Sequence, residues 1–266
     1  MRSFKISTTT IDYYLNKYGK NALHGVYLVP SDLPSTIAAT TPQFAGDVQL
    51  GIAKDAEFGV SALATQPAYT PYVQAIKTHK STYARNGADY VSYVFFRKEA
   101  QVQGVSTVKV WDCSLQCYDA RFLSTGGSAV ENNYTWLSFL PFEDKGNNPE
   151  LDNFLKYDTK PDAFGAQGWV SGQIFAQAVN DVVAQSGPNG LTRSALFTAI
   201  HGLTNFDDNG FIAPTNIGGK VGSKCLIGMQ VQNGKFVRVD PTAPGKFDCT
   251  GGTFDISIDP VKAYSG

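Results

Sequence analysis

The chain has 266 residues, and its 22 basic and 23 acidic side chains give a net charge of −1 at neutral pH. Hydrophobic residues make up 42% and charged residues 17%, a composition typical of a globular protein with a sizeable core. This balance argues against a nucleic-acid or anionic-membrane partner, because both require a basic surface. The sequence has no apolar run of about 18 residues, so it predicts no membrane-spanning helix.

From residue 22 to residue 140, short apolar segments alternate with longer amphipathic ones. The apolar segments predict strands at 22–29, 58–65, 81–85, 107–111 and 134–140. The segments between them predict helices at 34–51, with an interruption at Pro42, and at 70–79, 87–104 and 118–127. Because strands separated by helices form βαβ units, this order predicts a parallel sheet with right-handed crossovers.

The pattern changes after Pro141 to helices and then to strands. Helices are predicted at 149–157, 164–187 and 191–203. The second of these has an apolar face formed by Trp169, Ile174, Phe175, Ala178 and Val182. Nearer the C-terminus, two apolar segments flank Asn233-Gly234, which predicts a β-hairpin.

The four cysteines lie in two local pairs, Cys113 with Cys117 and Cys225 with Cys249. The cysteine spacing does not match a zinc site and the three histidines are far apart, so we expect two disulfides and no metal. Persistent disulfides are typical of proteins outside the cytoplasm. Residues 1–21 lack the apolar core of a signal peptide, which favours a mature or trimmed chain.

Motifs for catalysis or cofactor binding are not recognisable in the sequence, so we expect a protein that is not an enzyme and needs no cofactor. One segment, 205–216, partly matches a calcium-binding loop, with Asn205, Asp207 and Asn209 at ligand positions. Asn216 stands where such a loop needs a bidentate glutamate. We therefore interpret this segment as an Asp/Asn/Gly turn that joins a helix to a strand.

Polar and aromatic residues follow several predicted strands at their carboxyl ends. They are Ser31, Asp32, Asn86, Asp89, Trp111, Asp112 and Gln116. Loops after parallel strands emerge at one edge of the sheet, where open α/β sheets bind ligands. We therefore expect these side chains to face a single cleft. The alternative is that each caps a helix or a turn, as Asp112 would if it capped the turn closed by Cys113 and Cys117.

Three stretches resemble the branched-chain amino acid type of substrate-binding proteins of ABC transporters, which have the type I periplasmic binding fold. They are residues 95–123, 190–218 and 223–249, and the cysteine-bearing forms most similar to them are actinobacterial. The resemblance runs from about Ile6 to the C-terminus. It implies Rossmann-like α/β lobes with the first lobe incomplete, because the family's amino-terminal half-lobe precedes the segment that matches residues 6–19 here.

The resemblance also implies a domain organisation. A lead-in or hinge segment would cover 1–21, the second lobe 22–140, helices completing the first lobe 141–205, and returning β segments with a disulfide-bonded C-terminus 206–266. Asn86 to Asp89 fall near the family's aromatic contact, Asp112 and Cys113 near its acid for the ligand ammonium group, and Pro34 where some relatives carry tyrosine.

The function implied by the resemblance is capture of an amino acid or similar small polar molecule for an ABC permease in the membrane. The protein would act outside the cytoplasm, with a lipid anchor in its full-length form. Three alternatives remain open at this point: a ligand-sensing regulatory domain of the same fold, an α/β enzyme, and a fragment that binds nothing.

Overall fold

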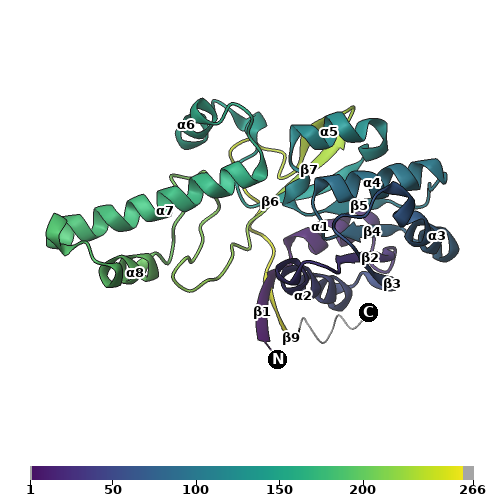
Figure 1. Ribbon diagram of the computed structural model, residues 1–266, viewed down its shortest axis with the longest axis horizontal. Coiled ribbons are helices and arrows are strands. Elements are labelled where there is room, and N and C mark those ends of the chain that lie inside the picture. Colours follow the sequence, from purple (N-terminus) through teal and green to yellow (C-terminus); the bar gives the residue numbers. More distant parts are fainter. Residues whose placement is uncertain (1, 260–266) are drawn as a thin grey trace.

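The computed structural model describes residues 2–259, and its largest element is a seven-stranded sheet of order β3-β2-β4-β5-β6-β7-β8 (Figure 1). Its parallel strands are β2 (His24–Pro30), β3 (Ala53–Val60), β4 (Tyr83–Asn86), β5 (Val110–Cys113) and β6 (Asn133–Leu137). An antiparallel hairpin of β7 (Ile227–Gln232) and β8 (Lys235–Asp240) extends the sheet beside β6. The α/β fold with a mostly parallel sheet is as predicted.

Helices cover both faces of this sheet. One face packs against α1 (Thr9–Tyr18) and α2 (Pro34–Leu50), and the other against α3 (Thr70–His79), α4 (Tyr90–Val102) and α5 (Ala120–Gly126). Successive side chains of a strand point to opposite faces, so Tyr83 of β4 enters the core under α1 and α2, whereas Ala84 enters the core under α3 and α4. Five 3-10 helices complete this description: η1 (Gln66–Tyr69), η2 (Leu115–Cys117), η3 (Gly127–Val130), η4 (Phe142–Asp144) and η5 (Pro188–Gly190).

Three predicted elements differ from the structure. The strand predicted at 107–111 is β5 at Val110–Cys113, because the fully buried residues of this segment begin at Val110. The second strand is β3 at Ala53–Val60 rather than 58–65. It is an edge strand that carries polar residues such as Asp55, which contacts His24 at 2.7 Å, so its sequence lacks an apolar signature. Helix α2 continues through Pro42 without the expected interruption. A proline costs one backbone hydrogen bond, and burial of Pro42 and Phe44 on the sheet offsets that loss.

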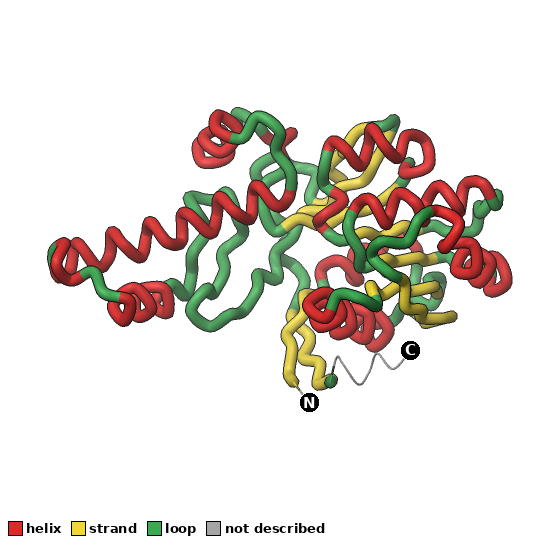
Figure 2. Tube along the Cα trace, viewed as in Figure 1, coloured by secondary structure: helices red, strands yellow, loops and turns green. Residues whose placement is uncertain are grey.

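The helices between β6 and β7 form an arm that projects away from the sheet and is anchored in the core at its base by Phe154 (Figures 1 and 2). They are α6 (Pro149–Tyr157), α7 (Ala163–Ser186) and α8 (Arg193–Gly202). Asp162 caps α7 by accepting a hydrogen bond from Gly165 N at 2.8 Å. Ala178 and Val182 are buried, but Phe175, which the sequence places on the same apolar face, is 55% exposed. Within the described residues the arm is therefore only partly packed.

The segments that flank the sheet are short and extended. β1 (Arg2–Ser7) pairs antiparallel with β9 (Thr253–Ile258), so the two ends of the described chain lie side by side. Residues 206–215 form the expected turn, with Asp208 and Asn209 in the left-handed backbone region. The predicted hairpin turn at Asn233-Gly234 is also present, with positive φ at both residues.

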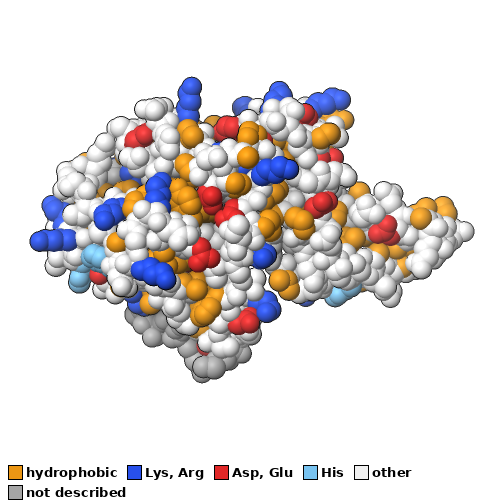
Figure 3. All heavy atoms as spheres, turned by 180° about the vertical axis from the view of Figure 1, so that it is seen from behind, with side chains coloured by type: hydrophobic (Ala, Val, Ile, Leu, Met, Phe, Trp, Pro, Cys, Tyr) orange, Lys and Arg blue, Asp and Glu red, His pale blue; other side chains and the backbone are white. Residues whose placement is uncertain are grey.

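Two features are absent from residues 2–259. Three or more His, Cys, Asp or Glu side chains do not come together there in a way that could hold a metal ion. Nor does that part of the chain contain a helix with the length and apolar character needed to cross a membrane. On the face shown in Figure 3, Lys and Arg side chains are scattered among acidic and uncharged ones rather than gathered in one patch.

Candidate ligand pocket

A pocket of about 290 Å³ lies at the carboxyl edge of the sheet, between β1 and the ends of β4 and β5. Its polar lining comes from elements far apart in the sequence: Lys5, Ser7 and Thr10, Gln43 and Asp47 of α2, Arg85 of β4, Asp112 of β5, and Ser114. After β2 the chain runs outward to β3 and then returns to β4 on the other side of β2. The pocket therefore lies next to the point where the strand order reverses, the usual ligand position in open α/β sheets.

Arg85 is the centre of the polar network on the pocket floor. Its Nη1 donates to Asp47 Oδ2 at 2.6 Å, and its Nη2 donates to Gln43 Oε1 at 2.9 Å. Its Nε lies 3.5 Å from Asp112 Oδ1. One guanidinium thus serves two carboxylates, whose side chains are only 6% and 2% exposed.

Three neutral donors complete this network. Trp136 Nε1 donates to Tyr14 Oη at 2.8 Å, and Tyr14 Oη donates to Asp112 Oδ2 at 2.9 Å. The Tyr83 hydroxyl lies 3.4 Å from both Asp47 Oδ2 and Asp112 Oδ2. Burial, reinforced by the Asp112 charge, raises the pKa of Tyr14 and Tyr83 well above the usual tyrosine value, so both remain protonated donors.

Burial also changes the acidity of the two carboxyl groups. It raises the pKa of Asp47 to about 6, although the Arg85 charge acts in the opposite direction. The pKa of Asp112 is raised for the same reason, again against the effect of Arg85. The two carboxyl groups are close enough to titrate as a coupled pair.

Of the seven residues predicted to contact ligand, Asp112 is the one that lines this pocket. Its neighbour Trp111 points to the opposite face of the sheet, where it packs against Phe96 with the Arg97 guanidinium 4.0 Å from its ring centre. Adjacent strand residues must point to opposite faces. The expectation that all seven side chains face one cleft is therefore not met.

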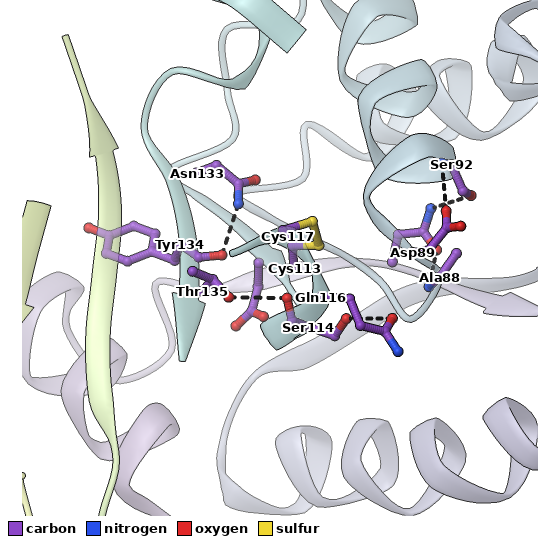
Figure 4. Close-up of a disulfide and its surroundings, with 12 residues drawn as sticks. Ala88, Asp89, Ser92, Cys113, Ser114, Gln116, Cys117, Asn133, Tyr134 and Thr135 are labelled. Atoms are coloured by element: carbon purple, nitrogen blue, oxygen red, sulfur yellow. Dashed lines mark hydrogen bonds between the residues drawn. A yellow bond between two sulfur atoms is a disulfide. The ribbon is translucent and has the colours of Figure 1, made fainter. Parts of the chain in front are cut away.

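The other five predicted residues lie at or just after the carboxyl ends of β2, β4 and β5 and make local hydrogen bonds. Asp89 accepts from Ser92 N at 3.0 Å and caps α4 (Figure 4). Asn86 Oδ1 accepts from Ala88 N at 2.9 Å. Gln116 Oε1 accepts from Ser114 Oγ at 3.1 Å.

The remaining two, Ser31 and Asp32, follow β2. Ser31 N donates to Val60 O at 2.8 Å, and Asp32 accepts from Ser61 Oγ and Ala62 N at 2.5 and 2.8 Å. Contacts of this kind, which cap a helix or hold a turn, are the alternative role given above for these residues. A ligand role for them stays a prediction.

Both predicted disulfides are present, and each supports a wall of the pocket. Cys113–Cys117 closes the loop that carries Ser114, whose backbone oxygen also accepts a hydrogen bond from Thr135 Oγ1 at 3.1 Å (Figure 4). Cys225–Cys249 lies beside the backbone pair between Leu226 and Asp248, and Leu226 lines the pocket.

Sequence reasoning missed Asp47, Arg85, Gln43 and Tyr14. The usable signal was a charged residue inside an otherwise buried element, as with Arg85 in β4, since buried charges require partners.

A model of the periplasmic binding protein family matches residues 5–235, which is most of the chain. The chain belongs to this family. Members of the periplasmic binding protein family act outside the cytoplasm as substrate-binding components of ABC transporters. Curated proteins, by contrast, include no significant match to the sequence.

Solved structures agree with this assignment at the level of the fold. A leucine-binding protein from Thermotoga maritima has 15% identity and a TM-score of 0.70, and the match covers 87% of this chain and 63% of that protein. A branched-chain amino acid ABC transporter protein from Thermus thermophilus with bound valine has 14% identity and a TM-score of 0.69, covering 88% and 63%.

A third relative is a fatty acid ABC transporter substrate-binding protein from Thermomonospora curvata. It has 19% identity and a TM-score of 0.66, and the match covers 96% of this chain and 63% of that protein. The chain therefore has the type I periplasmic binding fold and spans about 63% of the length of each of these three proteins.

Proposed function

We propose that this member of the periplasmic binding protein family captures an amino acid or similar small polar molecule and presents it to an ABC permease. The observation that carries the proposal is the polar pocket at the carboxyl edge of the sheet, with Asp112 and Arg85 in its floor. The pocket is large enough for a small solute, and its charged groups are already held in place by neighbours. A binding protein needs such preorganised polar groups, because unpaired groups would weaken binding.

In this proposal Asp112 binds the ammonium group of the ligand. Two carboxyl groups share the single charge of Arg85, so the ionised floor carries one excess negative charge. A charge-assisted hydrogen bond from an ammonium group to a carboxylate is about twice as strong as a neutral one. The leucine-binding and valine-bound relatives support an amino acid as the ligand.

The other predicted residues have different places in the proposal. Ser31, Asp32, Asp89 and Gln116 lie near the same edge of the sheet, so they would face the part of a two-lobed clamp that closes over the pocket. Asn86 is buried at the end of β4 and would act by holding the loop that follows. Trp111 would act from behind the sheet, through packing. Hinge closure around the ligand is how a two-lobed clamp works.

The proposed location is outside the cytoplasm, with a lipid anchor in the full-length form. The two disulfides support the location, since such bonds persist in oxidising compartments. We propose no catalytic role for any residue. The expected affinity of this chain by itself is low, because the described residues enclose the pocket from one lobe and a bound molecule would stay partly solvated.

The test is a thermal-shift screen of the purified chain against the standard amino acids and a series of fatty acids, followed by calorimetry. A ligand that binds only the folded state stabilises it by RT ln(1 + [L]/Kd), so the shift grows with ligand concentration. We expect at least one amino acid to raise the melting temperature, and Asp112→Asn to abolish that shift. Asp181→Asn, on the arm, is the control and should keep it. Stabilisation by fatty acids alone, or an amino-acid shift that survives Asp112→Asn, would contradict the proposal.

A further inference from the structure

The charge count under the pocket leads to an inference about regulation of the same site. Asp47 and Asp112 contribute two negative charges, Arg85 contributes one positive charge, and all three side chains are largely buried. Two carboxylates that share a site strongly resist simultaneous ionisation, and burial adds to that cost. The cluster is therefore stable with one proton bound, and it becomes net negative when that proton leaves.

Among residues 2–259, the other titratable groups that interact with the cluster are tyrosines, which do not supply a second cation. They are Tyr14 from α1, Tyr27 from β2, Tyr83 from β4 and Tyr93 from α4. At the pocket rim, Lys5 of β1 pairs with Asp255 of β9 at 3.1 Å, so its charge is already matched.

We propose that the Asp47–Arg85–Asp112 cluster is a proton-controlled charge beneath the pocket, so that the pocket attracts a cationic ligand group when the cluster has lost its proton. Acidification then weakens binding, because a proton on the cluster removes the excess negative charge. The ligand part of this inference rests on the proposed function, whereas the proton part concerns the free protein.

Trp136 provides a spectroscopic reporter of the protonation state of the cluster. Trp136 Nε1 donates to Tyr14 Oη, which donates to Asp112, so the indole proton of Trp136 lies two hydrogen bonds from the titrating pair. The chain has three tryptophans. A ¹H–¹⁵N spectrum of the free protein therefore contains three indole signals, and Trp136→Phe identifies the relevant one.

The first experiment follows the Trp136 indole signal of the free protein from pH 4.5 to 7.5. We expect a titration with a midpoint near the pKa of Asp47, about 6. The titration should disappear in this range in Asp47→Asn, because one carboxylate then faces one guanidinium. Asp181→Asn should titrate as the parent protein does. A flat signal in the parent protein, or a titration unchanged in Asp47→Asn, would overturn the inference without bearing on whether the protein binds amino acids.

The second experiment adds methylammonium, a minimal cationic probe, at pH 7.5 and at pH 5.0. With a midpoint near 6, the deprotonated fraction differs about tenfold between these conditions. We expect the concentration of methylammonium that half-saturates the Trp136 shift to rise about tenfold at pH 5.0, and methanesulfonate to cause no shift. A methylammonium response that does not depend on pH, or no response at pH 7.5, would overturn the link between the cluster and the pocket.

Discussion

Asp47 Oδ2 and Arg85 Nη1 lie 2.6 Å apart, although one residue belongs to the last turn of α2 and the other to β4. The two side chains are 6% and 13% exposed, so water contributes little to either charge. Breaking such a pair costs more than the pair itself contributes, because the remaining charge is left buried without a partner. Removal of one partner of the Asp47–Arg85 pair should therefore lower the free energy of unfolding by a measurable amount.

We expect Arg85→Leu to lower the free energy of unfolding at pH 7.5 by about 3–5 kcal/mol, the usual effect of removing one partner from a buried ion pair. Arg121→Leu is the matched control. Arg121 also contacts two carboxylates, Asp119 and Asp162, but its side chain is 60% exposed, so the loss should be much smaller. Urea denaturation measures both. Equal losses for the two variants would show that the Arg85 cluster is not buried in solution.

A second prediction concerns stability against pH. Burial raises the pKa of Asp47 to about 6 in the folded protein, whereas the unfolded value is near 3.8. Between these values the folded state binds more protons than the unfolded state, so the free energy of unfolding decreases as pH rises from about 4 to about 6. Asp47→Asn should remove part of this decrease, on the order of 2 kcal/mol.

Asp208 and Asp240 also have raised pKa values, at about 7 and about 6, mainly because of burial. They act in the same direction in both proteins, so the difference between parent and variant reports the coupled Asp47–Asp112 pair. Denaturation midpoints measured from pH 4 to pH 7.5 provide this difference. Parallel curves for the two proteins would contradict the assignment.

The disulfides give a third prediction. Replacing both cysteines of the Cys113–Cys117 pair by alanine should cost about 2 kcal/mol of unfolding free energy, and replacing Cys225 and Cys249 should cost about 3.5 kcal/mol, because the second bond closes the longer loop. Peptide mass mapping without reductant checks the pairing, and denaturation checks the energies. Four alkylatable cysteines in the protein from its native compartment would contradict both the bonds and the location.

The arm gives a fourth prediction. Phe154 of α6 is 1% exposed and belongs to the large core, whereas Phe175 of α7 is 55% exposed. We expect Phe154→Ala to cost about 3–5 kcal/mol and Phe175→Ala less than about 1 kcal/mol. Thermal and urea denaturation of the two variants provide the comparison. A large loss for Phe175→Ala would mean that the arm is packed against further residues in solution.

The sequence predicts the fold better than it predicts the site. Apolar segments bounded by Gly, Pro and Asp mark β2, β4, β5 and β6 within a few residues, because these central strands are buried on both faces. The edge strand β3 is half exposed and carries charges, so the same signal places it too late in the chain. The two disulfides could be predicted because the cysteines lie in local pairs and the spacing of cysteines and histidines does not suit a metal site.

The site depends on facts that one sequence does not contain. The rule that ligands bind at the carboxyl edge selects Asp112, which lines the pocket, yet it also selects Trp111, which does not, since the side of the sheet on which a pocket opens is set by how the helices pack. Asp47 and Arg85 were overlooked for a related reason. A charge inside a helix or strand is normally interpreted as surface, and only the tertiary contact at 2.6 Å reveals the pair.

The central claim, that this protein binds an amino acid at the carboxyl edge of its sheet, is tested most directly by a ¹H–¹⁵N titration with L-leucine and L-valine, the solutes named for two relatives. We predict that the backbone signals that move most belong to Ser7, Gln43, Arg85 and Ser114 around the pocket. Asp112→Asn should weaken these changes. Saturable changes confined to the arm, for example at Gln177 and Asn205, or the absence of any change at millimolar concentration with either solute, would contradict the account.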